Sequence, residues 1–299
     1  MTVTPVGVTS LSAVNALEEL IALLDLEQLE VNLFRGVSWK DDRPRVFGGQ
    51  VAGQALVAAG RTVGDRPVHS LHAYFLRPGD PSIPIVYDVD RIRDGKSFTT
   101  RRVVAIQHGE AIFNLQASFH VDETGFEHQI PMPEAPDPET LPSADELEPP
   151  VPGRLWAKQP IDIRYVDGPP WDRPVSPTGR QLVWIRADGT LPDDPVLHTC
   201  VVAYASDYTL LGSALVPHGR SYFHDDLMMA SLDHAMWFHR PFRADEWLLY
   251  SQASPAASGG RGLAMGGIYR RDGVVAVSVV QEGLIRQVDP NRLSPTFKG

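Results

Sequence analysis

The chain has 299 residues, of which 43% are apolar and 21% charged, as in an ordinary soluble globular protein. Its length allows one large domain or two of about 150 residues, each able to bury a core. With 27 Lys and Arg against 37 Asp and Glu, its net charge of −10 weighs against nucleic acid as a partner.

The single cysteine, Cys200, cannot form an internal disulfide or supply a cysteine cluster for a metal, which fits a reducing compartment. Acidic residues run through the apolar part of the first 35 residues, which argues against a secretory signal. No apolar run has the length of a bilayer span, and the final Phe-Lys-Gly is not a peroxisomal address. We therefore expect a cytoplasmic protein without membrane insertion.

The first half of the chain begins with a predicted amphipathic helix and short strand over residues 15–34. A charged turn at 40–45 precedes Val46-Phe-Gly-Gly-Gln50 and a helix over 51–63 that is rich in Ala and Gly. The paired glycines lack the Lys-Ser/Thr of a phosphate-binding loop. Strands are predicted at 69–78, 83–92, 98–107 and 110–121.

Proline then marks a change in the chain, because thirteen of the 26 prolines lie between Pro131 and Pro177. This stretch predicts a linker, parts of which run over the domains as extended chain. Its apolar residues are Leu155, Trp156, Ile161, Ile163 and Tyr165. The second half repeats the order of the first, with a strand from residue 181 that ends at an Asp188-Gly189 turn, a helix at 201–215, and strands at 231–241, 246–257, 262–270 and 274–286.

The two halves also share residues. Ser70-Leu-His-Ala-Tyr-Phe-Leu-Arg-Pro78 matches the order of Ser231-Leu-Asp-His-Ala-Met-Trp-Phe-His-Arg-Pro241 with a small insertion. Such a duplication predicts an α+β double hotdog, in which each long helix is wrapped by an antiparallel sheet. We expect an N-terminal repeat at 1–125, a Pro-rich linker at 126–180 and a C-terminal repeat at 181–299.

The repeat fails at two informative positions. Aligning the helices through Gly48 and His198 places Val57 opposite Asp207, and aligning the last hairpins places Ala117 opposite Gln281. Valine and alanine need no partners in a core, whereas Asp and Gln do. A single active site built mainly from the second half is the economical inference.

Asp207 is the only carboxylate of the apolar run 201–215, and on a helix its neighbours are core-type residues. A buried carboxylate needs donors or a positive partner, or its pKa is raised, and both arrangements suit catalysis. The alternative is that Asp207 caps a helix or marks a break in it.

Gln281 ends a strand face that is otherwise valine, and Ser231 begins another strand. With Asp207 these side chains could hold a water that attacks a carbonyl carbon. The alternatives are a solvated or cross-strand Gln and a tolerated small Ser. A dyad of Asp233 and His234 is disfavoured because adjacent strand residues face opposite ways, and His218 is interpreted as a loop histidine. Cys200 is a weak candidate nucleophile, since apolar surroundings favour the neutral thiol.

The chain contains blocks in the order LFRG, VFGGQVAGQAL, HSLHAYFLRPGD, YDVDRIRDGKSF, GFEHQ, QLVWIRADG, YASDYTLL, LDHAMWFHRPF, EWLLY and VVQEG. From about residue 26 to 286 they resemble the acyl-CoA thioesterase II (TesB-type) family. The resemblance implies a double hotdog that hydrolyses acyl-CoA to fatty acid and CoA without a metal or organic cofactor. It also implies a homo-oligomer, a dimer or a tetramer.

The family's catalytic Asp and Gln fall on Asp207 and Gln281, and its catalytic Thr falls on Ser231, which keeps the hydroxyl but lacks a methyl. We expect these three residues to activate a water against medium- to long-chain fatty acyl-CoA, with a backbone N–H near the amino end of a helix stabilising the oxyanion. Candidates for binding the CoA phosphates are Arg101, Arg102, Arg270 and Arg271, with solvated surface charge as the alternative.

Three other functions are alternatives to a thioesterase. A hotdog enoyl-CoA hydratase would carry a His about five residues after the Asp, where this chain has Gly212. A serine hydrolase is disfavoured because the chain has no Gly-x-Ser-x-Gly elbow. A catalytically weak double hotdog that binds acyl-CoA as a sensor or scaffold is supported only by Ser231.

Overall fold

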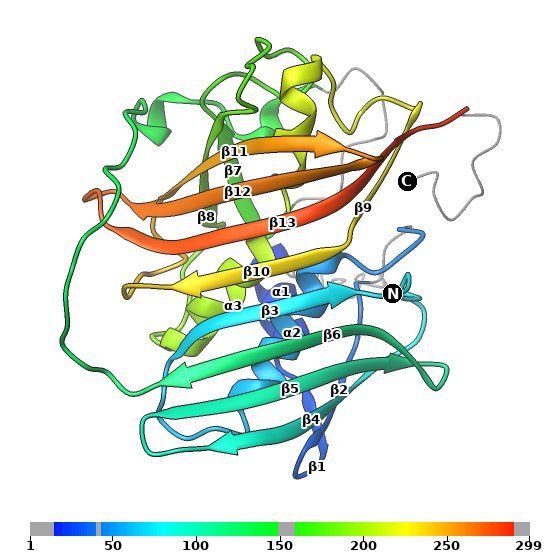
Figure 1. The fold of residues 1–299 in the computed structure, drawn as a ribbon, viewed down its shortest axis with the longest axis vertical. Coiled ribbons are helices and arrows are strands. Elements are labelled where there is room, and N and C mark those ends of the chain that lie inside the picture. The colour runs from blue at the N-terminus through cyan, green and yellow to red at the C-terminus, as the bar shows by residue number, and fades with distance from the viewer. Residues whose placement is uncertain (1–14, 40–42, 149–158, 290–299) are drawn as a thin grey trace, which may run out of the picture.

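The structure is a computed structural model that describes residues 15–39, 43–148 and 159–289. Its strands form one antiparallel sheet in the order β1-β2-β4-β5-β6-β3-β10-β13-β12-β11-β8-β7, with β9 paired to β13 off this path. Figure 1 shows the strands of the first half below those of the second, with the helices behind them. The halves join where β3 pairs with β10.

The first half contains two helices, α1 (Ala16–Leu24) and α2 (Gly48–Gly60). Asn15 begins α1 through a capping box with Glu18. The hairpin of β1 (Glu27–Glu30) and β2 (Leu33–Gly36) replaces the single short strand that the sequence predicted. The predicted antiparallel strands are present as β3 (Val68–Phe75), β4 (Ile85–Asp94), β5 (Phe98–Gln107) and β6 (Glu110–His120).

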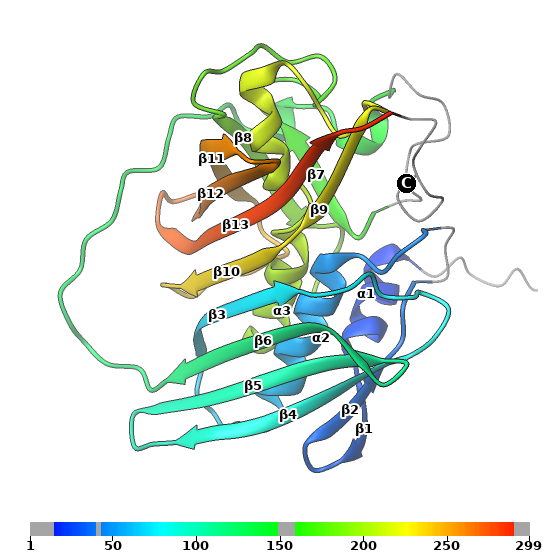
Figure 2. The same ribbon diagram turned by 45° about the vertical axis from the view of Figure 1, so that its right-hand side comes forward.

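The Pro-rich segment is more than a connection. After β6 it passes around one side of the molecule (Figures 1 and 2) and forms two short 3-10 helices, η1 (Pro138–Thr140) and η2 (Ala144–Glu146). It then supplies β7 (Ile161–Tyr165), which pairs with β8 (Gln181–Ala187) as an edge strand of the second half. The extended chain expected at Ile161, Ile163 and Tyr165 is present and forms a sheet strand, while Leu155 and Trp156 lie outside the described residues.

The second half repeats the helix-and-sheet unit, which confirms the α+β prediction. Its elements are α3 (Pro195–Ala205), η3 (Leu211–His218), β9 (Leu227–Ser231), β10 (Asp233–Phe238), β11 (Leu248–Ser258), β12 (Arg261–Arg270) and β13 (Val275–Gln287). Asp194 caps the start of α3 by accepting the Val196 N–H.

Helices α2 and α3 pack against each other, and glycines permit the close approach. A Cβ at Gly49 would collide with the Tyr204 carbonyl, and one at Gly53 would lie 3.3 Å from the Cys200 carbonyl. Position 60 at the other end of α2 faces Val196 near the start of α3. The helices therefore run antiparallel, which brings the start of α2 to the end of α3.

The predicted helix over 201–215 is wrong in its extent. Helix α3 ends at Ala205, the Ser206 hydroxyl donates back to the Ala203 carbonyl, and the chain resumes as the 3-10 helix η3. Asp207 therefore lies in the break between them. Val57 lies inside α2, so the alignment of Val57 with Asp207 is also corrected: counted from the last helical residue, Asp207 corresponds to Thr62.

Candidate active site

Asp207 lies where the end of α3 meets the start of α2, and it is a partly buried residue. Burial raises the pKa of this carboxyl to about 6, in spite of hydrogen bonds from Gln281, Ser231 and the Gly49 backbone N–H and the charge of Arg45. At neutral pH the group is ionised yet basic enough to accept a proton.

Gln281 is fully buried on β13 and holds the other two residues of the cluster together. Its Nε2 donates to Asp207 Oδ1 at 2.5 Å and to Ser231 Oγ at 3.0 Å. The Ser231 hydroxyl in turn donates to Asp207 Oδ1 at 3.2 Å. Because an ionised carboxylate only accepts, the amide nitrogen must face Asp207. Gln281 Oε1 is then left buried, with no hydrogen-bond partner among the described residues.

A β-bulge lies opposite Gln281. Ser231 on β9 pairs with Gly283, whereas Ala235 on β10 pairs with Val280, so four steps along one strand match three along the other. The extra residue turns the chain between β9 and β10 at the site. Bulges of this kind re-aim side chains beside active sites.

The amino end of α2 completes the site from the first half. Phe47 begins this helix without a side-chain cap, and the Gly49 N–H donates to the Asp207 carboxylate. A Cβ at Gly48 would lie 2.6 Å from Asp207 Oδ2, so the close approach requires glycine. The helix dipole at this end favours negative charge.

Arg45 brings a positive charge to the same place. Its Nη2 donates to the Met229 carbonyl of β9 at 2.9 Å, and its guanidinium attracts the Asp207 carboxylate. Burial lowers the pKa of Arg45, and Asp207 opposes that shift.

The structure brings together the three residues that the sequence selected, Asp207, Ser231 and Gln281, within hydrogen-bond distance of one another. It adds Gly48, Gly49 and Arg45, which the sequence analysis did not select. The paired glycines were noticed there only as a poor phosphate loop. Their position at the start of a helix was the signal that could have identified them.

The remaining polar candidates are not part of this cluster. Burial raises the pKa of the Cys200 thiol to about 12, so this residue stays neutral. His218 is exposed at the end of η3. Asp233 accepts the Glu282 N–H and His234 contacts Ser206, so the two side chains do face opposite ways.

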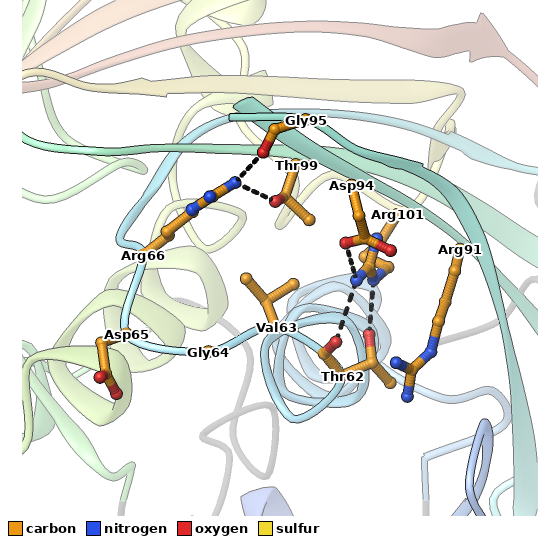
Figure 3. Close-up of a pocket in the computed structure, with 10 residues that line it drawn as sticks. All are labelled: Thr62, Val63, Gly64, Asp65, Arg66, Arg91, Asp94, Gly95, Thr99 and Arg101. Carbon is orange, nitrogen blue, oxygen red and sulfur yellow. Dashed lines mark hydrogen bonds and ion pairs between the residues drawn. The ribbon is translucent and has the colours of Figure 1, made fainter. Parts of the chain in front are cut away.

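Arg101 does not form a basic rim. It is 1% exposed, and its five N–H groups bond Thr62 Oγ1 and O, the carbonyls of Arg93 and Thr100, and Asp94. Figure 3 shows the bonds from Arg101 to Thr62 and Asp94, which lie beside a cavity of about 310 Å³ at the carboxyl end of α2, the end away from Gly48. The prediction of Arg101 as a phosphate ligand is therefore wrong, because its donors are already used.

The other three arginines are exposed or partly exposed and paired with carboxylates. Arg102 pairs with Asp90 at 3.1 Å, Arg271 pairs with Asp137 at 2.5 Å, and Arg270 pairs with Asp272 beside the β12–β13 turn. Surface charge, the alternative interpretation, describes them.

Two kinds of feature are missing from the described part of the chain. None of its helices is long and apolar enough to cross a membrane. Within the same residues, no group of three or more His, Cys, Asp or Glu side chains is placed to hold a metal ion.

Comparison with known proteins gives concordant matches. The family model described as acyl-CoA thioesterase matches residues 169–284, and the one described as acyl-CoA thioesterase N-terminal domain matches residues 37–120. The chain is 45% identical over 293 residues to acyl-coenzyme A thioesterase 8 of Mus musculus, covering 91% of each chain. It is 41% identical over 281 residues to acyl-CoA thioesterase 2 of Haemophilus influenzae, covering 90% of this chain and 98% of that one.

Solved structures agree with these matches. An acyl-CoA thioesterase II, TesB2, from Mycobacterium marinum is 50% identical with a TM-score of 0.76, over 91% of this chain and 98% of that one. A protein with a hot dog fold from Alicyclobacillus acidocaldarius is 19% identical with a TM-score of 0.74, over 91% and 99% of the two chains, and supports the fold alone. The predicted double hotdog is confirmed.

Proposed function

The chain belongs to the acyl-CoA thioesterase family, and we propose that it hydrolyses medium- to long-chain fatty acyl-CoA by direct attack of a water held by Asp207, Ser231 and Gln281. That it is an acyl-CoA thioesterase follows from the family. The chain-length range rests on the TesB-type resemblance. The water mechanism rests on the geometry of the three side chains.

The observation that carries the mechanism is a hydrogen-bond acceptor that the cluster of Asp207, Ser231 and Gln281 leaves unused. Gln281 Oε1 is a buried acceptor without a partner among the described residues, and the neighbouring residue Asp207 is not fully buried. A water placed there can donate one hydrogen to each oxygen, which satisfies the orphan acceptor and aims the water at a neighbouring carbonyl carbon.

The reaction balances without a covalent enzyme intermediate. The water oxygen forms a bond to the thioester carbon while Asp207 accepts a proton from the water. The carbon–sulfur bond then breaks, CoA leaves as a thiolate, and the proton held by Asp207 returns to the sulfur. Ser231 and Gln281 keep the carboxylate oriented through their hydrogen bonds to Oδ1.

Negative charge develops on the carbonyl oxygen during this attack. Gly48 is the first residue of α2, so its N–H has no partner within the helix, and it lies at the positive end of α2 beside Asp207. We assign it the oxyanion. A donor of this kind lowers the barrier by about 3 to 4 kcal/mol.

Assembly and location are further parts of the proposal. The family resemblance favours a homo-oligomer, a dimer or a tetramer, and the lone buried Cys200 fits a reducing cytoplasm. Light scattering during size-exclusion chromatography gives the mass of the assembly. A monomer at micromolar concentration would contradict the proposal of a homo-oligomer.

Release of free CoA thiol from a medium-chain and a long-chain acyl-CoA tests the mechanism in the wild type and in Asp207→Asn. Removing the base should lower kcat by about 10² to 10⁴-fold, because general-base catalysis contributes that much. Circular dichroism controls for the fold. Equal turnover in both proteins would refute the role of Asp207.

The same assay separates the rival functions. Binding of acyl-CoA without turnover by the wild type would support a sensor or scaffold. Loss of the enoyl absorbance from an unsaturated acyl-CoA, without release of thiol, would support a hydratase.

A further inference from the structure

The pair Asp233-His234 follows the bulge at the active site, and its side chains face opposite ways along β10. Each forms a hydrogen bond to the immediate neighbour of a catalytic residue. We propose that Asp233 and His234 are positioning residues that fix Asp207, Ser231 and Gln281 at their working distances. This inference rests on the proposed water mechanism and deepens it.

Asp233 holds the strand that carries Gln281. Its Oδ1 accepts the Glu282 backbone N–H at 2.6 Å, and the Leu232 N–H donates to the Glu282 carbonyl at 2.9 Å. A bulge leaves a backbone group without its ladder partner, and the Asp233 carboxylate supplies the missing acceptor here. The bond fixes the backbone of Glu282, and therefore the direction of its neighbour Gln281, relative to Ser231.

His234 holds the break that carries Asp207. It is 1% exposed, and its Nε2 lies 2.8 Å from Ser206 Oγ, while the Ser206 hydroxyl lies 2.9 Å from the Ala203 carbonyl. His234 Nδ1 has no hydrogen-bond partner among the described residues. An unpaired buried N–H at Nδ1 would cost more free energy than an unprotonated Nδ1. The proton of the neutral ring therefore belongs on Nε2, which donates to Ser206.

Burial lowers the pKa of His234 to about 4, so the ring is neutral at ordinary pH and acts through this single donated bond. The chain from His234 through Ser206 to Ala203 fixes the last turn of α3 against β10. Asp207 is the next residue after that anchor. Its distance to the strands that carry Ser231 and Gln281 is set there.

The first half of the molecule indicates that the fold does not need a histidine here. Ala117, the counterpart of Gln281, pairs with Leu71 on β3, and Leu71 is fully buried. In the second half, His234 is the buried residue one position before Ala235, which pairs with Val280, the neighbour of Gln281. An apolar side chain therefore satisfies the same sheet position in the same fold, and the polar one is retained for the site.

The test uses paired variants of the full-length protein, with kcat, KM and melting temperature measured for each. His234→Leu should lower kcat about 100-fold, as a misplacement near 1 Å does, with KM changed less than about threefold and the melting temperature kept or raised. Ser206→Ala removes the same bond by a smaller change and should lower kcat in the same direction. Asp233→Ala should lower kcat, and Asp233→Asn should restore most of it, because an amide oxygen still accepts the Glu282 N–H.

Matched controls carry the same bonds away from the site. His239, an exposed residue just after β10, contacts Ser278 Oγ of β13 at 2.9 Å, and Asp167 accepts the Leu182 N–H at 3.0 Å. His239→Leu and Asp167→Ala should therefore keep kcat. A kcat loss as large in these controls as in the variants at the site would mean a general structural effect and would overturn the proposal.

Other outcomes also decide the matter. Normal kcat in His234→Leu, Ser206→Ala and Asp233→Ala, with Asp207→Asn inactive, would refute the positioning roles and leave the water mechanism standing. Full activity in Asp207→Asn would refute the mechanism itself. A failure of Asp233→Asn to rescue would contradict the bond assigned to Asp233.

Discussion

The two halves of the molecule end their central helices in contrasting ways. After α2, Thr62 meets Arg101 of β5, whose five N–H groups all have acceptors. After α3, Asp207 meets Gln281 of β13, and Gln281 Oε1 has no partner among the described residues. The first end is complete without a ligand, whereas the second leaves an acceptor for one.

The sheet registers sharpen this contrast. Ala117 on β6 lies opposite Arg101 on β5, and Gln281 on β13 lies opposite Ala264 on β12. The large polar side chain thus lies on the first strand of the hairpin in one half (Arg101) and on the second strand in the other half (Gln281). In the first half it closes the turn between β4 and β5 through Asp94, and in the second it reaches the partly accessible Asp207. One fold therefore carries a structural end and a reactive end.

The largest expected effect is at the reactive end. Gln281→Leu removes the donor to Asp207 and the open acceptor together, and kcat should fall about 10² to 10³-fold, the effect of losing one preorganised hydrogen-bonding group. Gln116→Leu, an exposed change next to Ala117, is the control. Thiol release measures both, and equal kcat in the two variants would contradict the assignment.

The structural end should respond in the opposite way. Arg101→Met removes the buried donors to Thr62, to the Arg93 and Thr100 carbonyls and to Asp94, and should cost about 3 kcal/mol in the free energy of unfolding. The kcat of the folded protein should be unchanged, because Arg101 lies at the far end of α2, a helix about 20 Å long. Arg102→Met, an exposed neighbour, is the control. Urea unfolding measures both, and a stability loss as large in the control would remove the special role of Arg101.

Asp207 should reduce stability while it supports activity. Its folded pKa of about 6 lies above the ordinary value of 3.8 for an aspartate, so folding disfavours the ionised form. The free-energy cost of burying the ionised Asp207 is absent below the pKa of the carboxyl in the unfolded chain. It grows as pH rises from there to the pKa of the folded protein. Asp207→Asn should therefore stabilise the protein by about 1 to 2 kcal/mol at pH 8, and by less at pH 4. Urea unfolding at both pH values checks this, and a variant less stable at pH 8 than the wild type would contradict it.

The smallest effect is expected at Ser231. Ser231→Thr keeps the hydroxyl and restricts its rotamer, so kcat should stay within about threefold of the wild type. Ser231→Ala should lower kcat about tenfold, because Asp207 and Gln281 lose their shared partner. Steady-state assays at one pH distinguish the two, and equal losses would mean that the hydroxyl has no role.

Much of the reactive end could be predicted from the sequence. Asp207 and Gln281 were polar residues at positions where a repeat predicts a core, and polarity without an obvious partner is visible in a sequence. The alignment that placed Val57 opposite Asp207 was wrong because helix ends depend on local hydrogen bonds. The Ser206 bond that ends α3 gives no sign in a run of small apolar residues.

Other features depend on three-dimensional neighbours. Gly48 and Gly49 belong to the first half and reach Asp207 only because α2 and α3 run antiparallel. Arginine is usually a surface residue, yet Arg101 is buried because its guanidinium donates to carbonyls at the end of a helix and near a hairpin turn. Strand β7 was hidden among prolines, since five residues give little periodic signal.

The dependence of kcat/KM on pH tests the central claim most directly. A general base with a pKa of about 6 requires activity to fall as pH decreases through about 6, when Asp207 takes up a proton. The wild type should show this fall of kcat/KM at acidic pH, whereas the low residual kcat/KM of Asp207→Asn should not change with pH in this range. An acidic limb that persists in Asp207→Asn would contradict the assignment of Asp207 as the base.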